Sequence, residues 1–192
     1  MCKYQSNSLA QLQVYIFSIV LLSCSSGCVH APAKLSLSSS QYLFCIAYKP
    51  WTSDVRYKGI LIDTSGKVFG FRRMWTKDAD DTDSVITKEV FTKLFSELHF
   101  ERTIDQDSVH MYYAAAVQLC GEMSEQIVNG NDCNDIFFFA FHFDNSREEY
   151  IVHGLRSEGN FCWYHIDTNS KPIIAWLKNQ DTNWRHCNCL CP

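Results

Sequence analysis

The sequence lacks a concentrated basic segment. Its 17 Lys and Arg residues are outnumbered by 21 Asp and Glu, the formal net charge is −4, and the largest basic cluster is the pair Arg72-Arg73. Proteins that bind nucleic acid neutralise several phosphates with Lys or Arg gathered on one surface. We therefore expect no nucleic-acid partner.

Sequence motifs for catalysis are also missing. The chain has no Gly-x-Ser-x-Gly motif, and its eight glycines form no phosphate-binding loop. An enzyme is thus the less favoured class. A cysteine–histidine site stays open as an alternative, because such residues meet in space rather than in sequence.

No apolar run is long enough to cross a membrane. The main run, residues 14–22, has nine positions, whereas a helix needs about 20 to span a bilayer. Nine positions fit the apolar middle of a signal peptide, which has about 7–15.

This run ends in Leu21-Leu22-Ser23-Cys24, which resembles the lipobox of bacterial lipoproteins. The resemblance implies that residues 1–23 are removed as a signal peptide and that the Cys24 thiol then carries a diacylglycerol. Cys28 is the second choice for this lipidation. The resemblance also implies a lipid-anchored protein of the bacterial cell envelope. In a Gram-negative cell the membrane would be the outer one, because Ser25 permits that sorting.

The rest of the chain divides into two parts. Residues 24–40 are rich in serine, which predicts a flexible tether. Residues 41–192 are expected to form a single domain, because the chain length leaves room for one domain besides a short leader.

Ten cysteines are many for 192 residues and favour an oxidising compartment. Without Cys2 in the leader and Cys24 in the lipid anchor, eight remain, and an even number can pair completely. For the cysteine-rich end, residues 186–192, disulfides are favoured over a zinc or copper(I) site. The disulfide candidates in the domain are Cys45, Cys120, Cys133, Cys162, Cys187, Cys189 and Cys191.

Apolar, β-rich segments predict six strands. Two of them flank Ser65-Gly66, a hairpin signal. Residues 136–143 are apolar at both parities, as expected of a strand covered on both faces. The predicted strands are residues 41–48, 57–64, 67–75, 136–143, 149–155 and 161–167.

Three helices are predicted from apolar residues at three- and four-residue spacing. The first is capped by Asp83 or Ser84 and reaches Leu98, the second covers residues 109–127, and the third is capped by Ser170 with Pro172 in its first turn. We expect the first two to form an antiparallel αα-hairpin. Strands and helices in blocks predict an α+β fold with a largely antiparallel sheet and helices on one face.

The acidic loop before the first helix resembles an EF-hand calcium loop. Asp78, Asp80 and Thr82 fall at ligand positions 1, 3 and 5, and Glu89 falls at position 12. Asp83 stands where such a loop needs glycine, so the favoured interpretation is a solvated loop that caps a helix. No cofactor is expected on this interpretation, and calcium is the alternative.

Three histidines lie on successive predicted strands and are candidate zinc ligands: His142, His153 and His165. A two-residue turn at Asn145-Ser146 would put His142 and His153 four rungs apart, more than about 13 Å. His165 would point through the other face. Zinc ligands lie about 2 Å from the metal, so no histidine triad is expected.

The function hypothesis is a membrane-anchored envelope lipoprotein. Its domain would be a non-catalytic binding or structural module for an envelope protein or ligand. The alternatives are a small envelope hydrolase with a Cys/His or carboxylate site, and a calcium-binding domain that uses residues 78–89.

Overall fold

The computed structural model describes residues 41–50, 56–74, 85–120, 122–128 and 134–181. The predicted signal peptide and tether lie outside these residues and stay predictions. None of the helices in the described ranges is long and apolar enough to cross a membrane.

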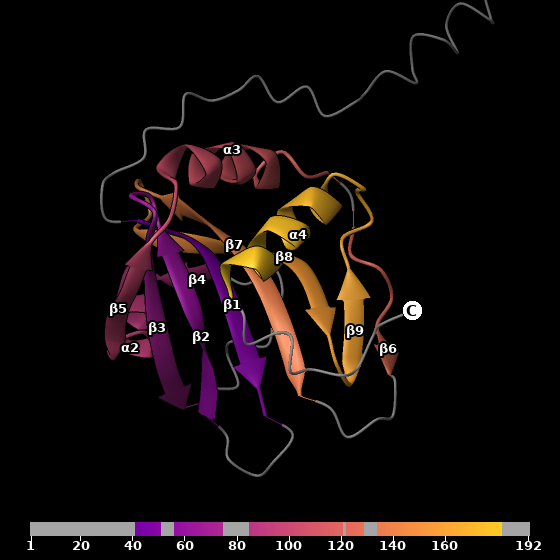
Figure 1. Ribbon diagram of the computed structural model, residues 1–192, viewed down its shortest axis with the longest axis horizontal. Helices are drawn as coiled ribbons and strands as arrows, with labels where there is room; N and C mark the ends of the chain where they lie inside the picture. The colour runs from indigo at the N-terminus through magenta and orange to yellow at the C-terminus, as the bar shows by residue number, and fades with distance from the viewer. Residues whose placement is uncertain (1–40, 51–55, 75–84, 121, 129–133, 182–192) are drawn as a thin grey trace, which may run out of the picture. The chain divides into compact units, whose positions relative to one another are not determined.

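The described strands form a nine-stranded sheet (Figure 1). Its order is β5-β3-β2-β1-β7-β8-β9-β6, and β4 pairs separately with β8. Every pairing between these strands is antiparallel. The strands are β1 Tyr42–Lys49, β2 Arg56–Asp63, β3 Lys67–Met74, β4 Val85–Thr87, β5 Leu98–Thr103, β6 Ile127–Val128, β7 Asp135–Asp144, β8 Glu149–Glu158 and β9 Phe161–Tyr164.

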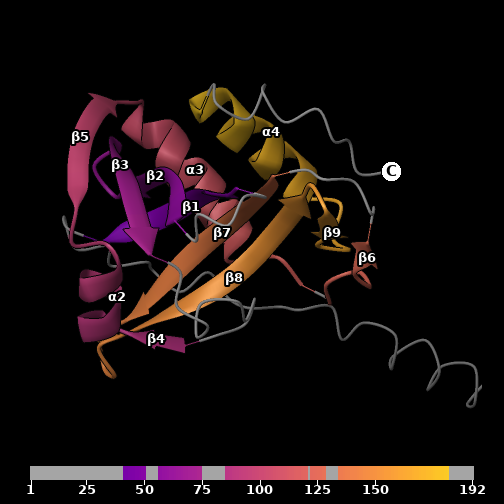
Figure 2. The ribbon, with the colours of Figure 1, turned by 90° about the horizontal axis from the view of Figure 1, so that it is seen from below.

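Helices cover both faces of this sheet. They are α2 Lys88–Leu94, α3 Gln106–Ala116 and α4 Ser170–Gln180. Figures 1 and 2 show α3 and α4 on one face, here called the α3/α4 face, and α2 on the opposite one, the α2 face. The predicted α+β class with a mostly antiparallel sheet is confirmed.

The α3/α4 face is built from alternate residues of the central strands. Phe44 of β1 pairs with Ala140 of β7, and its ring centroid lies 6.1 Å from that of Tyr113 in α3 and 5.2 Å from that of Trp176 in α4. Phe44 is completely buried. One aromatic ring of the sheet thus contacts both helices.

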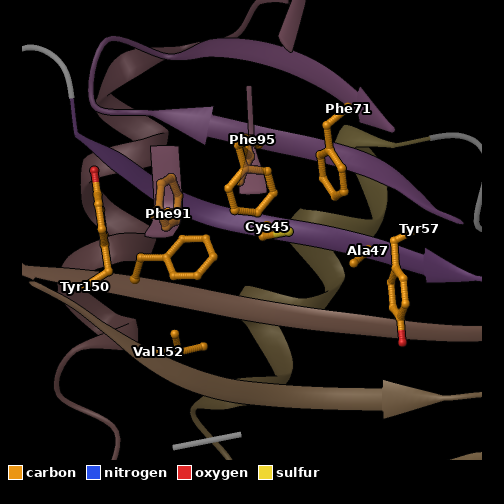
Figure 3. Packing of buried hydrophobic residues seen from close by; sticks show 10 residues of the cluster. Cys45, Ala47, Tyr57, Phe71, Phe91, Phe95, Tyr150 and Val152 are labelled. Atoms are coloured by element: carbon orange, nitrogen blue, oxygen red, sulfur yellow. The ribbon is translucent and has the colours of Figure 1, made fainter. Parts of the chain in front are cut away.

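The α2 face holds the other alternate residues and centres on Phe91 of α2 (Figure 3). Its ring centroid lies 4.0 Å from Tyr150, 4.6 Å from Phe95 and 5.3 Å from Phe141. Burial on both faces explains why the β7 sequence is apolar at both parities. The cluster comprises Cys45, Ala47, Tyr57, Leu61, Phe71, Phe91, Phe95, Phe141, Tyr150 and Val152.

The hairpin predicted at Ser65-Gly66 is confirmed. The Oδ1 atom of Asp63 accepts hydrogen bonds from the N–H groups of Ser65 and Lys67, at 2.8 and 2.9 Å. Gly66 has a φ of 79°, in the left-handed region that favours glycine. The side chain of Asp63 therefore fixes the turn that joins β2 and β3.

The prediction for residues 109–127 is wrong in its second half. α3 ends at Ala116, and residues 122–128 run extended beside β9. The Ser124 N–H donates to the Tyr164 carbonyl at 2.8 Å, and the Ile166 N–H donates to the Glu122 carbonyl at 3.1 Å. Pairing with a neighbouring strand outweighs the helical spacing of the apolar residues.

The first predicted helix is also shorter than expected. Its cap is Thr87, whose Oγ1 accepts the Val90 N–H at 3.3 Å, instead of Asp83 or Ser84. Leu94 and Leu98 have helical spacing, but Leu98 pairs with Phe71 across the sheet. The strands β4, β5 and β6 were not predicted, and they raise the number of strands from the expected six to nine. The expected αα-hairpin is wrong, because β5 separates α2 from α3 in the chain. The expected placement of all helices on one face is also wrong, because α2 lies on the face opposite α3 and α4.

Replacing Phe91 with Ala should lower the free energy of unfolding by about 3–5 kcal/mol, because it empties the centre of the α2 face. Urea unfolding followed by circular dichroism measures the loss. The matched control is Val90→Ala, since the neighbouring Val90 is 45% exposed and should change stability by less than about 0.5 kcal/mol. Equal losses in the two variants would contradict the described packing.

Candidate functional site

A charged cluster joins β8 to α4 on the α3/α4 face. The Oε1 atom of Glu158 lies 2.6 Å from Arg156 Nε and 2.6 Å from Lys178 Nζ. The Glu158 side chain is only 10% exposed, and the Arg156 and Lys178 side chains are 29% and 23% exposed. Lys178 Nζ also lies 5.9 Å from the ring centroid of Phe138. The two cations thus neutralise one mostly buried carboxylate, which fastens the helix to the sheet.

The sequence did not predict this cluster of Arg156, Glu158 and Lys178. Arg156 and Glu158 are two residues apart, so they lie on the same face of a strand, and that spacing was the available signal. Nothing in the local sequence connects them to Lys178, 20 residues further along the chain. A second link lies nearby, where the Tyr48 hydroxyl of β1 donates to Asp181 Oδ2 at the end of α4, at 3.0 Å.

Two of the candidate histidines lie closer together than predicted. β7 ends at Asp144 and β8 begins at Glu149, so the turn between them is longer than the expected two residues. His142 pairs with Ile151, and His153 pairs with Ala140. The two histidines are therefore two rungs apart on one face, and the predicted separation of four rungs is wrong.

His142 instead takes part in a contact between the sheet and α3. The Tyr113 hydroxyl lies 3.2 Å from His142 Nδ1. Burial raises the pKa of Tyr113, so the phenol stays protonated and its hydroxyl is hydrogen-bonded to the imidazole. Within the described residues, no three His, Cys, Asp or Glu side chains are arranged to hold a metal ion.

The Asp167 carboxylate links the backbone at Cys120 to the segment that follows β9. The Cys120 N–H donates to Asp167 Oδ2 at 3.3 Å, and the Asp167 N–H donates to His165 Nδ1 at 3.2 Å. The Asn169 N–H and then the Cys120 N–H hold the pKa of Asp167 below its ordinary value, with a smaller contribution from the charge of His165. The Cys120 sulfur lies 3.5 Å from the Gln118 carbonyl oxygen. The carboxylate therefore organises the backbone around this group.

The calcium candidates divide between described and undescribed parts of the chain. Asp78, Asp80 and Thr82 lie outside the described residues. Glu89 lies in the first turn of α2 and is exposed, where a carboxylate suits the helix dipole. The calcium loop stays a prediction.

The cysteine candidates divide in the same way. Cys24, Cys28, Cys133, Cys187, Cys189 and Cys191 lie outside the described residues. Cys45 is buried in the α2-face cluster and Cys120 is half-buried, and neither forms a disulfide. Cys162 of β9 is buried, with its sulfur 3.5 Å from the Gly159 carbonyl oxygen, and no disulfide joins two of the described cysteines. The disulfide pattern as a whole stays a prediction.

Exposed apolar side chains gather where β9 meets β6. Ile127 and Val128 are 42% and 63% exposed, and Tyr164 and Ile166 are 45% and 57% exposed. Ile127 pairs with Cys162 and Val128 with Phe161, so at this end of the sheet Ile127 and Tyr164 lie on one face and Val128 on the other. We call this group the β6–β9 patch.

Comparison with known proteins finds no family, no curated relative and no solved structure that matches this chain.

Removing the Glu158 carboxylate should destabilise the domain more than removing one of its cations. Glu158→Gln leaves Arg156 and Lys178 half-buried and facing each other, and we expect a loss of roughly 1–3 kcal/mol. Lys178→Met keeps the Arg156–Glu158 pair and should cost less than about 1 kcal/mol. Urea unfolding measures both, and a larger loss in Lys178→Met would contradict the shared carboxylate.

Asp167→Asn should lower the melting temperature at neutral pH but not in strong acid. Because its pKa is lowered in the folded state, the Asp167 carboxylate stabilises the fold above its ordinary pKa, and this contribution is lost as the pH falls through the lowered value. Thermal melts of wild type and variant from about pH 7 to about pH 2 should therefore converge. A pH-independent difference would refute this role, and Glu97→Gln, at an exposed carboxylate, serves as the control.

Proposed function

We propose that this chain is a bacterial envelope lipoprotein that is held on a membrane through Cys24 and whose domain binds a partner without catalysis. One observation supports the binding role. The carboxylates described above have hydrogen-bond or ion-pair partners within the domain, whereas several apolar side chains are exposed to solvent. Glu158 has two cations and Asp167 has backbone N–H donors, whereas the β6–β9 patch presents apolar side chains to solvent. Clustered apolar exposure of this kind is typical of interaction sites.

The anchor is supported by the sequence alone. The lipobox-like Leu21-Leu22-Ser23-Cys24 follows an apolar run too short to span a membrane. A lipid with more than one acyl chain holds a protein firmly, since each buried CH₂ contributes about 0.8 kcal/mol. The Ser-rich residues 24–40 would then give the domain reach from the membrane, and the outer membrane is the proposed location in a Gram-negative cell.

The cysteine content supports an oxidising location. The chain has ten cysteines in 192 residues, and disulfides persist outside the cytosol. This argument for an exported domain does not depend on the lipid.

The alternative with a specific observation in its favour is a small hydrolase at Cys120. Cys120, His165 and Asp167 are brought together from two segments, although the sulfur lies beside a carbonyl oxygen, which is no base. An activated thiol reacts rapidly with iodoacetamide near neutral pH. The rate of Cys120 labelling in wild type, with Cys120→Ala as the blank, separates a catalytic thiol from a structural one.

Replacing Cys24 with Ser should abolish both lipid attachment and cleavage before residue 24. Intact-mass measurement of the membrane-extracted wild type should give a chain that begins at Cys24 and carries acyl groups. Cys28→Ser serves as the matched control and should be processed as wild type. The proposed anchor fails if Cys24→Ser still carries fatty acid, or if the wild type is found unprocessed inside the cell.

A further inference from the structure

The strand β5 forms one edge of the sheet. It stands at the end of the strand order and pairs with β3, and Figures 1 and 2 both show it at the border of the domain. Its Phe100 is 59% exposed, and His99, Glu101 and Thr103 are exposed with it. An edge of this kind presents unpaired backbone N–H and C=O groups to solvent, which suits the addition of another strand.

An imidazole and a carboxylate lie side by side on one face of this edge. His99 Nε2 lies 3.5 Å from Glu101 Oε1, and both side chains lie over Gly70 of β3. The other oxygen of Glu101 is 3.2 Å from the Arg102 guanidinium. A Cβ atom at Gly70 would collide with the His99 ring and the Glu101 carboxylate. The glycine therefore lets an imidazole and a carboxylate occupy neighbouring places on the face of the edge strand. Phe100 lies on the other face, with its ring centroid 6.1 Å from that of Phe69.

The order of these residues makes β5 complementary to itself. In an antiparallel pair of two β5 strands centred on Phe100, His99 of each copy faces Glu101 of the other, and the two Phe100 rings face each other. Centring the pair on Glu101 would oppose two carboxylates, and centring it on His99 would oppose two imidazoles. An aromatic pair and a carboxylate opposite an imidazole that can donate a hydrogen bond to it favour pairing, whereas two carboxylates directly opposite each other destabilise it. One two-fold register is thus favoured.

We propose that two copies of this chain associate through β5, antiparallel and centred on Phe100, so that their sheets join across a two-fold axis. Such an interface uses the same surface on both copies, as two-fold symmetry requires. β5 has neither proline nor lysine, two residues that commonly protect an edge strand from pairing. The bulge between Phe100 and Arg102 increases the local twist, and two-stranded pairs accept more twist than wide sheets.

The first test compares two equally exposed apolar residues. Phe100→Glu puts two carboxylates at the two-fold axis, and Met111→Glu places the same charge at a residue of α3 that is 58% exposed. Sedimentation velocity of the full-length mature chain in detergent, over a range of protein concentrations, reports the dimer. We expect a dimer for wild type and Met111→Glu, and a monomer for Phe100→Glu. A wild type that stays monomeric at the highest concentration, or equal weakening by both variants, would overturn the proposal.

A charge exchange tests the register itself. His99→Glu alone should oppose two carboxylates, Glu101→Lys alone should oppose two basic groups, and each should weaken the dimer about tenfold or more. The double variant H99E/E101K restores opposite charges at both positions, so it should dimerise again. Because recovery requires a folded domain, this variant also excludes unfolding as the cause of the single-variant losses. Failure of the double variant to recover would refute the Phe100-centred register.

Discussion

The constraint on which the rest of the structure depends is the burial of the central strands on both faces. β1 and β7 lie in the middle of the sheet, and nearly every residue of β1 is buried. Alternate residues must therefore find separate apolar partners, Phe44 with α3 and α4 on one side and Cys45 with the cluster around Phe91 on the other. This requirement places helices on both faces and leaves the outer strands as the exposed parts of the domain.

The same burial requires that the carboxylates inside the domain have hydrogen-bond or ion-pair partners. Glu158, Asp135 and Asp181 are buried beside the helices or at strand ends, and a buried carboxylate is stable only with partners. Glu158 has Arg156 and Lys178, Asp135 accepts the Asn160 N–H at 2.8 Å, and Asp181 accepts the Tyr48 hydroxyl. These side chains hold elements of the fold together. At the sheet edges, by contrast, apolar and charged side chains of β5 and apolar side chains of β6 meet solvent.

Features of the fold that depend on residues close together in the sequence were predicted correctly. The Ser65-Gly66 hairpin and the two-sided burial of β7 are confirmed. The last helix also forms, but its N-cap is Asn169 and not the expected Ser170. The second half of the helix predicted over residues 109–127 and the two-residue turn before β8 were wrong, because both depend on pairing between segments far apart in the chain. The Glu158 cluster and the meeting of Cys120 with Asp167 depend on contacts across 20 and 47 residues, for which one sequence carries no signal.

The brevity of α2 has a consequence for how the domain moves. A seven-residue helix is too short to be stable by itself in water, and the strand β4 that precedes it has only three residues. Both are held by Phe91 against the sheet and by the Lys88 N–H, which donates to the Glu148 carbonyl at 2.9 Å. If β4 and α2 separated together from β8 and the rest of the sheet, the rings of Tyr150 and Phe141 that now pack on Phe91 would be uncovered.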